Sequence, residues 1–243
     1  MREMRSLSIN HHALISGFLN ILYPSQCPAC GNPSDTFRTS PICSSCWSKI
    51  KRFAGPSCAL CALPFASEYA AVCGQCVKKR PPFSKVIFYG LYEGVLAEVI
   101  NQLKFHDLRR LSKPLGTLLL NCDLPVIDGM LPVPLTLKGL RERGFNQSLL
   151  MAKVLSKKLQ VPLFMDILCK KKETLPQIGL SKKERSTNLK KAFEVKGDIK
   201  GLRLLLIDDV MTTGATVTEC SKVLMNAGAQ EVIVLTLARA GEP

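Results

Sequence analysis

The chain has 243 residues, with 33 lysines and arginines against 19 aspartates and glutamates, a formal net charge of +14. A hydrophobic content of 47% is ordinary for a globular protein and excludes a disordered polymer. No apolar run approaches the roughly 20 residues that a transmembrane helix needs, which excludes a membrane-spanning protein. The length predicts one large domain, or a medium domain with a small one.

Positive charge is concentrated in the first 200 residues. They hold 30 basic and 14 acidic residues, a balance of +16, whereas residues 201–243 hold 3 and 5. A basic body of this kind attracts polyanions such as phosphate-rich small molecules or nucleic acid. The alternative is a solvated surface that only keeps the protein in solution.

The N-terminal segment, residues 1–26, contains one apolar run at residues 13–22. Ser, Gly and Asn interrupt this run, and no small-residue cleavage site follows it, so it favours an amphipathic helix over a signal peptide. We therefore expect the protein in the cytoplasm.

Cysteine is the strongest signal in the first third of the chain. Eleven cysteines cannot all pair in disulfides, and eight of them form four Cys-x-x-Cys pairs within 50 residues. The pairs are Cys27/Cys30, Cys43/Cys46, Cys58/Cys61 and Cys73/Cys76. Two such pairs supply the four thiolates of one structural zinc site, so the pattern predicts two zinc ions. Sequential pairing gives a double zinc ribbon, and an interleaved cross-brace is the alternative.

Residues 27–80 are therefore predicted to be a small zinc-ribbon domain. The segment has few apolar residues, and a domain of this size usually needs metal to fold. Trp47 is expected to pack against the first site, and residues 77–82 are expected to form the linker that follows. The remaining cysteines, Cys122, Cys169 and Cys220, are isolated in apolar surroundings and are predicted to be buried.

Residues 81–243 alternate between strand and helix patterns. The predicted strands are Val86–Tyr92, Ile127–Val133, Leu204–Ile207 and Val232–Leu237. The predicted helices are Gly94–Phe105, with Leu96, Val99, Ile100 and Leu103 on one face, and Phe145–Leu159. This alternation is typical of an α/β fold with a doubly wound parallel sheet.

One stretch near the C-terminus combines a strand, two acids and a loop of small residues. Leu204–Ile207 is typical of a strand buried on both faces, and Asp208 and Asp209 follow at its carboxyl end, where open α/β sheets bind ligands. The loop that leads into the next helix is Thr212, Thr213, Gly214, Ala215 and Thr216. Amides at a helix start can hold a phosphate, and paired carboxylates can accept hydrogen bonds from a diol. The stretch therefore predicts a sugar-phosphate site.

Two rival interpretations of this stretch are weaker. A strand ending in Asp-Asp also resembles a Walker B motif, and Gly139–Gly144 has the spacing of a P-loop start. However, Phe145 and Asn146 stand where a P-loop needs Lys and Ser or Thr. The acids could also serve only to cap the following helix.

These residues carry a resemblance to known families. Two acids followed by Thr-Thr-Gly-x-Thr resemble the phosphoribosyl pyrophosphate (PRPP) signature of type I phosphoribosyltransferases. Residues 131–147, with their Pro-Val-Pro and Arg-Gly-Phe-Asn-Gln segments, resemble the ComF family, also called GntX. The cysteine-rich module does so too, as do Gln177, Leu180-Ser181, Arg185, Asn188 and Ala192-Phe193. One departure is Lys170–Lys172, because the family usually has Arg in this segment, and Lys lacks a bidentate grip.

The resemblance implies a phosphoribosyltransferase-like domain that binds PRPP together with Mg²⁺. It implies that residues 212–216 hold the 5′-phosphate, and that Asp208 and Asp209 bind the ribose hydroxyls and act in catalysis. It further implies that basic side chains neutralise the pyrophosphate, namely Lys138, Arg141, Arg143 and Arg185. Residues 170–191 then form a mobile basic lid, with a solvated loop as the alternative.

The family resemblance implies a role in DNA uptake during natural transformation, with single-stranded DNA as a partner and a DNA-uptake helicase as a further one. Two functional classes remain open. The chain is either an enzyme that transfers a pentosyl group from PRPP to an acceptor, or an inactive PRPP sensor or scaffold that binds nucleic acid or proteins.

Overall fold

The computed structural model of the chain describes most residues outside the N-terminal segment. The described residues are 26–36, 38–65, 71–171 and 192–241. The predicted N-terminal helix lies outside this part of the chain, as do Arg185 and most of the predicted lid.

The chain divides into two compact units, Met1–Lys49 and Ile50–Pro243. The first unit holds the first two Cys-x-x-Cys pairs and the short helix α2 (Ser44–Trp47). The second unit holds the other two pairs together with the α/β sheet. The predicted domain boundaries at residues 26 and 80 remain predictions.

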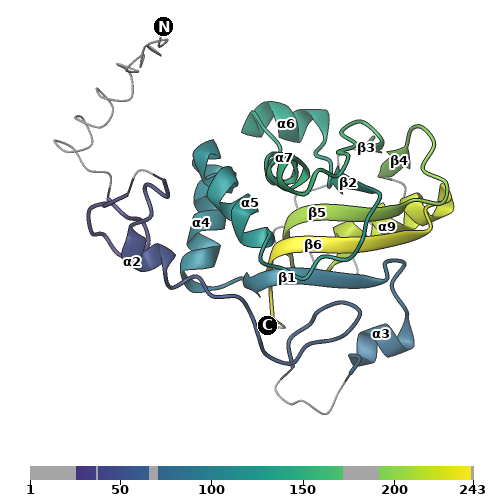
Figure 1. Cartoon of the computed structure of the whole chain (residues 1–243), viewed down its shortest axis with the longest axis horizontal. Coiled ribbons are helices and arrows are strands. Elements are labelled where there is room, and N and C mark those ends of the chain that lie inside the picture. The colour runs from purple at the N-terminus through teal and green to yellow at the C-terminus, as the bar shows by residue number, and fades with distance from the viewer. Residues whose placement is uncertain (1–25, 37, 66–70, 172–191, 242–243) are drawn as a thin grey trace, which may run out of the picture. The chain divides into compact units, whose positions relative to one another are not determined.

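The second unit alternates strands and helices along the chain (Figure 1). Its helices are α3 (Gly74–Lys78), α4 (Gly94–Phe105), the 3₁₀ turn η1 (Arg109–Leu111), α5 (Ser112–Leu119), α6 (Leu137–Arg143), α7 (Gln147–Leu159) and α9 (Ala215–Asn226). Its strands are β1 (Lys85–Leu91), β2 (Gly129–Pro132), β3 (Leu168–Lys170), β4 (Phe193–Val195), β5 (Arg203–Met211) and β6 (Glu231–Arg239).

Four strands form a parallel sheet in the order β1-β6-β5-β2. In the centre, Leu206 of β5 pairs with Val234 of β6, and Leu131 of β2 pairs with Leu206 from the other side. Strands β3 and β4 form a separate antiparallel pair. Because all four main strands run in one direction, their carboxyl ends meet at one edge, where an open α/β sheet binds ligands.

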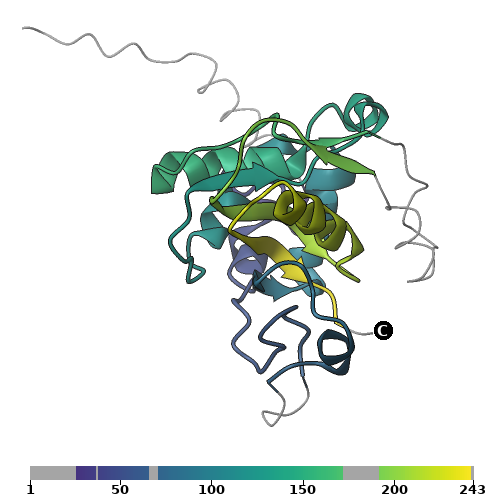
Figure 2. The same cartoon turned by 90° about the vertical axis from the view of Figure 1, so that its right-hand side faces the viewer.

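Helices cover both faces of this sheet, with α9 on one face and α5 and α7 on the other (Figure 2). On the α9 side, Val217, Cys220 and Leu224 join a buried cluster with alternate residues of β5 and β6. Leu204–Ile207 are all fully buried, as two covered faces require. The predicted doubly wound α/β fold is confirmed.

The predicted elements agree closely with the observed ones. Helix α4 has the predicted bounds and the predicted buried face of Leu96, Val99, Ile100 and Leu103. Helix α7 begins two residues late because Asn146 caps it, accepting from the Leu149 N–H at 3.1 Å. The first residues of the predicted linker, Val77 and Lys78, belong to α3.

Two of the three isolated cysteines are buried as predicted, namely Cys122 and Cys220. Cys169 is half-buried instead, and its thiol donates to the Asp166 carbonyl at 3.3 Å. Among the described residues, no helix combines the length and apolar character that crossing a bilayer demands.

Candidate functional site

Two groups of four cysteine sulfurs come together in the described structure. Each group is made by two consecutive Cys-x-x-Cys pairs, and within each group the sulfurs lie within 4.8 Å of one another. The groups are Cys27, Cys30, Cys43 and Cys46, and Cys58, Cys61, Cys73 and Cys76. The structure thus has the sequential arrangement and not the interleaved cross-brace. Four thiolates fill the tetrahedral coordination of zinc, so the sites fit structural zinc ions.

The two cysteine sites repeat one local design. The residue before the first cysteine of each site forms an antiparallel bridge with a proline, Gln26 with Pro33 and Ser57 with Pro64. Four residues after that cysteine, a residue with positive φ donates its N–H back to the cysteine carbonyl. This residue is Gly31 at 2.7 Å in the first site and Ala62 at 2.8 Å in the second. The first Cys-x-x-Cys pair of each site is thus held by the same local turn.

The third cysteine of each site precedes a short helix. Cys43 is the N-cap of α2, and Cys73 is the N-cap of α3. The fourth cysteine, Cys46 or Cys76, then lies on the first helical turn, which brings its sulfur back to the group. Trp47 is half-buried in α2 beside Cys46, and its packing against the metal site remains a prediction.

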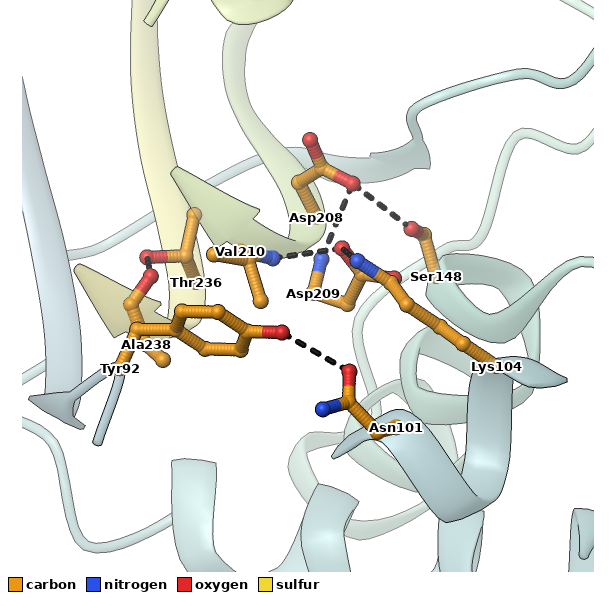
Figure 3. A network of polar contacts seen from close by, with 9 residues as sticks. All are labelled: Tyr92, Asn101, Lys104, Ser148, Asp208, Asp209, Val210, Thr236 and Ala238. Atoms are coloured by element: carbon orange, nitrogen blue, oxygen red, sulfur yellow. Dashed lines mark hydrogen bonds and ion pairs between the residues drawn. The ribbon is translucent and has the colours of Figure 1, made fainter. Parts of the chain in front are cut away.

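The two acids lie in the carboxyl half of β5, and side chains from two helices reach them (Figure 3). Lys104 Nζ of α4 lies 2.8 Å from Asp209 Oδ1, and both side chains are largely buried. Ser148 Oγ of α7 donates to Asp208 Oδ1 at 3.1 Å. The backbone N–H of Asp209 donates to the same Asp208 oxygen at 2.9 Å. Both acids are therefore held in fixed orientations.

Burial and neighbouring charge change the protonation of this group. Burial, together with the negative charge of Asp209, raises the pKa of Asp208 from its ordinary value of 3.8 to about 7. The charge of Lys104, the Asp209 N–H and the Ser148 hydroxyl act in the opposite direction. For Lys104, burial alone would lower the pKa, but the adjacent Asp209 outweighs it and the pKa is raised. Asp208 therefore gains or loses its proton near neutral pH.

The loop after β5, where the phosphate cup is predicted, leads directly into α9. Gly214 adopts φ +75 as the N-cap of α9, a conformation that favours glycine. A Cβ at Gly214 would also lie 2.5 Å from Met211 Cε, so the position has no room for a side chain. Thr212 is exposed, and Thr213 and Thr216 are half-buried. The Ala215 N–H donates to Thr213 Oγ1 at 3.4 Å. A helix start of this kind can receive an anion, so the phosphate site at this loop stays a prediction.

Three of the predicted pyrophosphate ligands, Lys138, Arg141 and Arg143, lie on helix α6. Thr136 caps α6 by accepting from the Gly139 N–H at 3.0 Å. Lys138 and Arg141 are exposed on this helix. The Arg143 guanidinium carbon lies 5.7 Å from the ring centre of Phe105, at the end of α4. Arg143 thus extends toward the helix that carries Lys104.

Lys170 lies at the end of β3, and the charge of Asp208 acts on it. Burial lowers its pKa, the charge of Asp208 raises it, and the charge of Arg143 lowers it. Lys170 is therefore within electrostatic reach of Asp208 and of Arg143. Arg143 itself lies beside the end of α4, and the fourth predicted pyrophosphate ligand, Arg185, lies outside the described residues.

Three residues of the site were missed by the sequence interpretation, namely Lys104, Ser148 and Arg239. Lys104 lies on an amphipathic helix, where a lysine is normally expected on the solvated face, so its sequence position gave no sign of burial. Ser148 belongs to no motif that would have distinguished it from the other serines. Arg239 ends an apolar strand, and a charge in that position could have drawn attention. Its side chain is 5% exposed and donates to the Met211 carbonyl at 3.1 Å and to the Thr212 carbonyl.

Comparison with known proteins identifies the family. Competence protein F of Haemophilus influenzae is 36% identical over 210 residues, which cover 82% of this chain and 90% of that protein. The chain belongs to the ComF family. DNA utilization protein YhgH of Escherichia coli K12 is 34% identical to this ComF-family chain over 206 residues, 82% of the chain and 90% of that protein.

Two domain families match separate parts of this ComF-family chain. Residues 18–77 match the double zinc ribbon domain, and residues 146–243 match the phosphoribosyl transferase domain. The glutamine PRPP amidotransferase of Bacillus subtilis aligns with a TM-score of 0.38 and 23% identity, over 51% of this chain and 25% of that one. The domain matches agree with the sequential cysteine groups and with the parallel sheet.

Proposed function

We propose that the chain binds PRPP with Mg²⁺ at the carboxyl edge of its sheet, as a phosphoribosyltransferase-like protein acting in DNA uptake. One observation carries the proposal: two oriented acids on β5 lead directly into a small-residue loop that opens α9. This juxtaposition suits a ligand that has a diol and a phosphate on the same sugar. The names of the relatives, competence and DNA utilization proteins, support the biological role.

The parts of PRPP match the parts of the proposed site. The 5′-phosphate binds the loop of Thr212, Thr213, Gly214, Ala215 and Thr216. The ribose hydroxyls donate to Asp208 and Asp209, which would also hold Mg²⁺ through water. The pyrophosphate is neutralised by basic side chains, namely Lys138, Arg141, Arg143 and Arg185.

Catalysis would break the bond between C1′ and the pyrophosphate oxygen while an acceptor forms a new bond to C1′. Positive charge builds on the ribose as pyrophosphate leaves, and the carboxylates of Asp208 and Asp209 stabilise it. Mg²⁺ would stabilise the charge of the leaving group. The alternative role, a sensor or scaffold, needs the same ligand contacts but no acceptor.

Titration calorimetry with PRPP and Mg²⁺ tests the site. The double variant Asp208→Ala, Asp209→Ala should lose PRPP binding, since each charge-assisted hydrogen bond is worth about 1.5–3 kcal/mol. Asp128→Ala is the matched control, because Asp128 pairs with Arg203 at the amino end of β5. Equal PRPP affinity in the double variant and the parent would disprove the assignment.

A second measurement separates the two roles. Pyrophosphate release from PRPP with base or nucleic-acid acceptors would establish a transferase. PRPP binding without release for any acceptor would favour the sensor or scaffold.

Single-stranded DNA is the second ligand that we propose, with a DNA-uptake helicase as a further partner. The basic balance of the first 200 residues supports binding to a polyanion. The end of α4 and helix α6 supply a surface for it. Phe105 is 59% exposed with Arg143 over its ring, and Arg141 is exposed nearby on the helix of Arg143. An exposed ring beside guanidinium groups can stack on a base while the charges contact phosphates.

A further inference from the structure

Arg239 connects the second cysteine site to the candidate phosphate loop. It is the last residue of β6, and its guanidinium donates to backbone carbonyls on two sides. On one side, Nε donates to the Cys61 carbonyl at 3.2 Å. On the other, Nη1 donates to the Met211 carbonyl at 3.1 Å, to the Thr212 carbonyl, and to the Ala240 carbonyl at 2.6 Å. Cys61 is a member of the second site, and Thr212 begins the loop.

The guanidinium is buried without a carboxylate partner in the described part of the chain. A buried charge is costly unless it is compensated. Four thiolates around one divalent cation leave two net negative charges, so a loaded second site would place an anion on the Cys61 side of Arg239. The second cysteine site would therefore stabilise Arg239 in two ways: the Cys61 carbonyl accepts its hydrogen bond, and the negative charge of the loaded site compensates its positive charge.

The cysteine turn that presents the Cys61 carbonyl is fixed to the sheet. The Leu60 carbonyl accepts from the Val86 N–H of β1 at 2.9 Å. Ala62 is 3% exposed and belongs to the same buried cluster as Val86, with Cys61 packed against it. When this turn is folded, the Cys61 carbonyl thus has a defined position relative to β6.

The opposite side of Arg239 determines how the loop starts. The Met211 and Thr212 carbonyls would point elsewhere if the peptide units rotated, and their bonds to Arg239 oppose this rotation. Met211 Cε packs beneath Gly214, so the position of Met211 also limits the position of the α9 N-cap. Holding Met211 and Thr212 therefore sets the direction of the loop that would receive the phosphate.

We propose that Arg239 is a positioning residue through which the second cysteine site controls ligand affinity at the phosphate loop. The proposal rests on the proposed function for its ligand. With the second site folded around its metal, Arg239 is held by Cys61 and fixes Met211 and Thr212. Without that site, Arg239 loses a hydrogen bond and its compensating charge, and the loop loses its fixed start.

The test compares three variants of the full chain with Arg203→Met as the matched control. Arg203 is half-buried, but it is the first residue of β5 and pairs with Asp128 at the amino edge of the sheet. The variants are Arg239→Met, Arg239→Lys and Cys61→Ser. Each is measured for zinc content, for PRPP affinity with Mg²⁺ by calorimetry, and for hydrogen exchange of the amides of residues 210–218 without ligand.

We expect Arg239→Met and Cys61→Ser each to weaken PRPP binding about ten- to hundred-fold, with faster exchange of the loop amides. Arg239→Lys should recover part of the affinity, because it restores a donor and a charge. Arg239→Met should keep two zinc ions. Combining Cys61→Ser with Arg239→Met should weaken binding no more than either change alone, since both break one connection.

Three outcomes would overturn the proposal: parental PRPP affinity and loop exchange in Arg239→Met, losses that add in the double variant, or an equal loss in Arg203→Met. If Cys61→Ser fails to fold, the Arg239 variants still decide it, because their zinc content can be checked. If the parent binds no PRPP, the proposed function is wrong, and the hydrogen-exchange comparison alone decides the role of Arg239.

Discussion

Lys104 Nζ lies 2.8 Å from the carboxylate of Asp209, and this ion pair joins helix α4 to the strand that carries both acids. The two residues are far apart in the sequence, and their side chains are 18% and 10% exposed. A second contact fixes the same helix: Tyr92 Oη, just after β1, donates to Asn101 Oδ1 of α4 at 2.8 Å (Figure 3). The acids thus have a resident cation before any ligand arrives.

Removing this cation should destabilise the protein at high pH. Lys104→Met leaves Asp209 buried without its partner, which we expect to lower the free energy of unfolding by about 3 kcal/mol at pH 8. Asp208 has a pKa of about 7, and its protonation removes one of the two adjacent negative charges, so the deficit should shrink as the pH falls from 8 to 5. Urea unfolding at both pH values measures this, with Lys104→Arg as the charge-preserving control. A deficit that does not change with pH would mean that Lys104 acts through packing alone.

Asp208 should reduce stability at the pH where it would bind its ligand. Its folded pKa of about 7 exceeds the ordinary value of 3.8. The folded state therefore binds a proton between these values when the unfolded state does not, and stability falls as the pH rises through 7. Asp208→Asn keeps an oxygen that can accept from Ser148 and from the Asp209 N–H. It should raise the free energy of unfolding by about 1–2 kcal/mol at pH 8 and by less at pH 5.

Asp128→Asn supplies the opposite control for that experiment. Hydrogen bonds from the Arg203 guanidinium and backbone lower the pKa of Asp128 to about 2. The ionised Asp128 carboxylate therefore stabilises the folded state above pH 4, and this stabilisation is lost as the pH falls toward 2. Asp128→Asn should accordingly destabilise the protein at pH 8. If Asp208→Asn also destabilises it at pH 8, the carboxylate of Asp208 is not under electrostatic strain.

The two cysteine sites should respond differently to substitution. Elemental analysis should give two zinc ions per chain, and Cys27→Ser or Cys58→Ser should each remove one. Because the second site shares its compact unit with the sheet, Cys58→Ser should lower the melting temperature of the sheet. Cys27→Ser should unfold only the first unit. A fully folded, metal-free parent would contradict the zinc assignment, and equal melting shifts would contradict the difference between the sites.

Binding to single-stranded DNA should be driven by charge and weakly dependent on sequence. The logarithm of the association constant should fall linearly with the logarithm of the salt concentration, with a slope of about −0.7 for each phosphate contact. Arg141→Ala should make that slope shallower by about one contact. Phe105→Ala should weaken binding a few-fold at every salt concentration, because stacking releases no counterions.

Val126→Ala is the control for Phe105, since Val126 is an exposed apolar residue with no aromatic ring. Fluorescence anisotropy with oligonucleotides of mixed sequence gives the affinities. An affinity that does not change with salt would exclude the electrostatic account. If the protein does not bind single-stranded DNA at low salt, its positive charge serves only as a solvated surface that keeps it in solution.

The sheet and the metal sites could be predicted because their signals are local. A buried parallel strand is a continuous apolar run, as at Leu204–Ile207, and a zinc turn has a fixed Cys-x-x-Cys spacing. The antiparallel pair β3–β4 was missed because each strand has only three residues, too few to show a period. Helix α5 was missed because Pro114 and Gly116, which usually weaken a helix, lie inside it.

The partners of the acids could not be predicted for a different reason. The Asp-Asp pair is visible in the sequence, but the distance from Lys104 to Asp209 depends on how α4 packs on the sheet. Ser148 likewise reaches Asp208 only because α7 lies beside β5. Such contacts join residues at no fixed spacing in the sequence, so they can be identified only from the folded structure.

The attachment of the second cysteine turn to the sheet bears on how the protein can be divided into fragments. A fragment that begins at Ile50 keeps that turn, the Leu60 carbonyl for Val86 and the Cys61 carbonyl for Arg239. A fragment trimmed to residue 81 loses all of these and exposes the core that Ala62 covers. The sheet and the second zinc turn should therefore be expressed together, in a fragment that begins no later than Ile50.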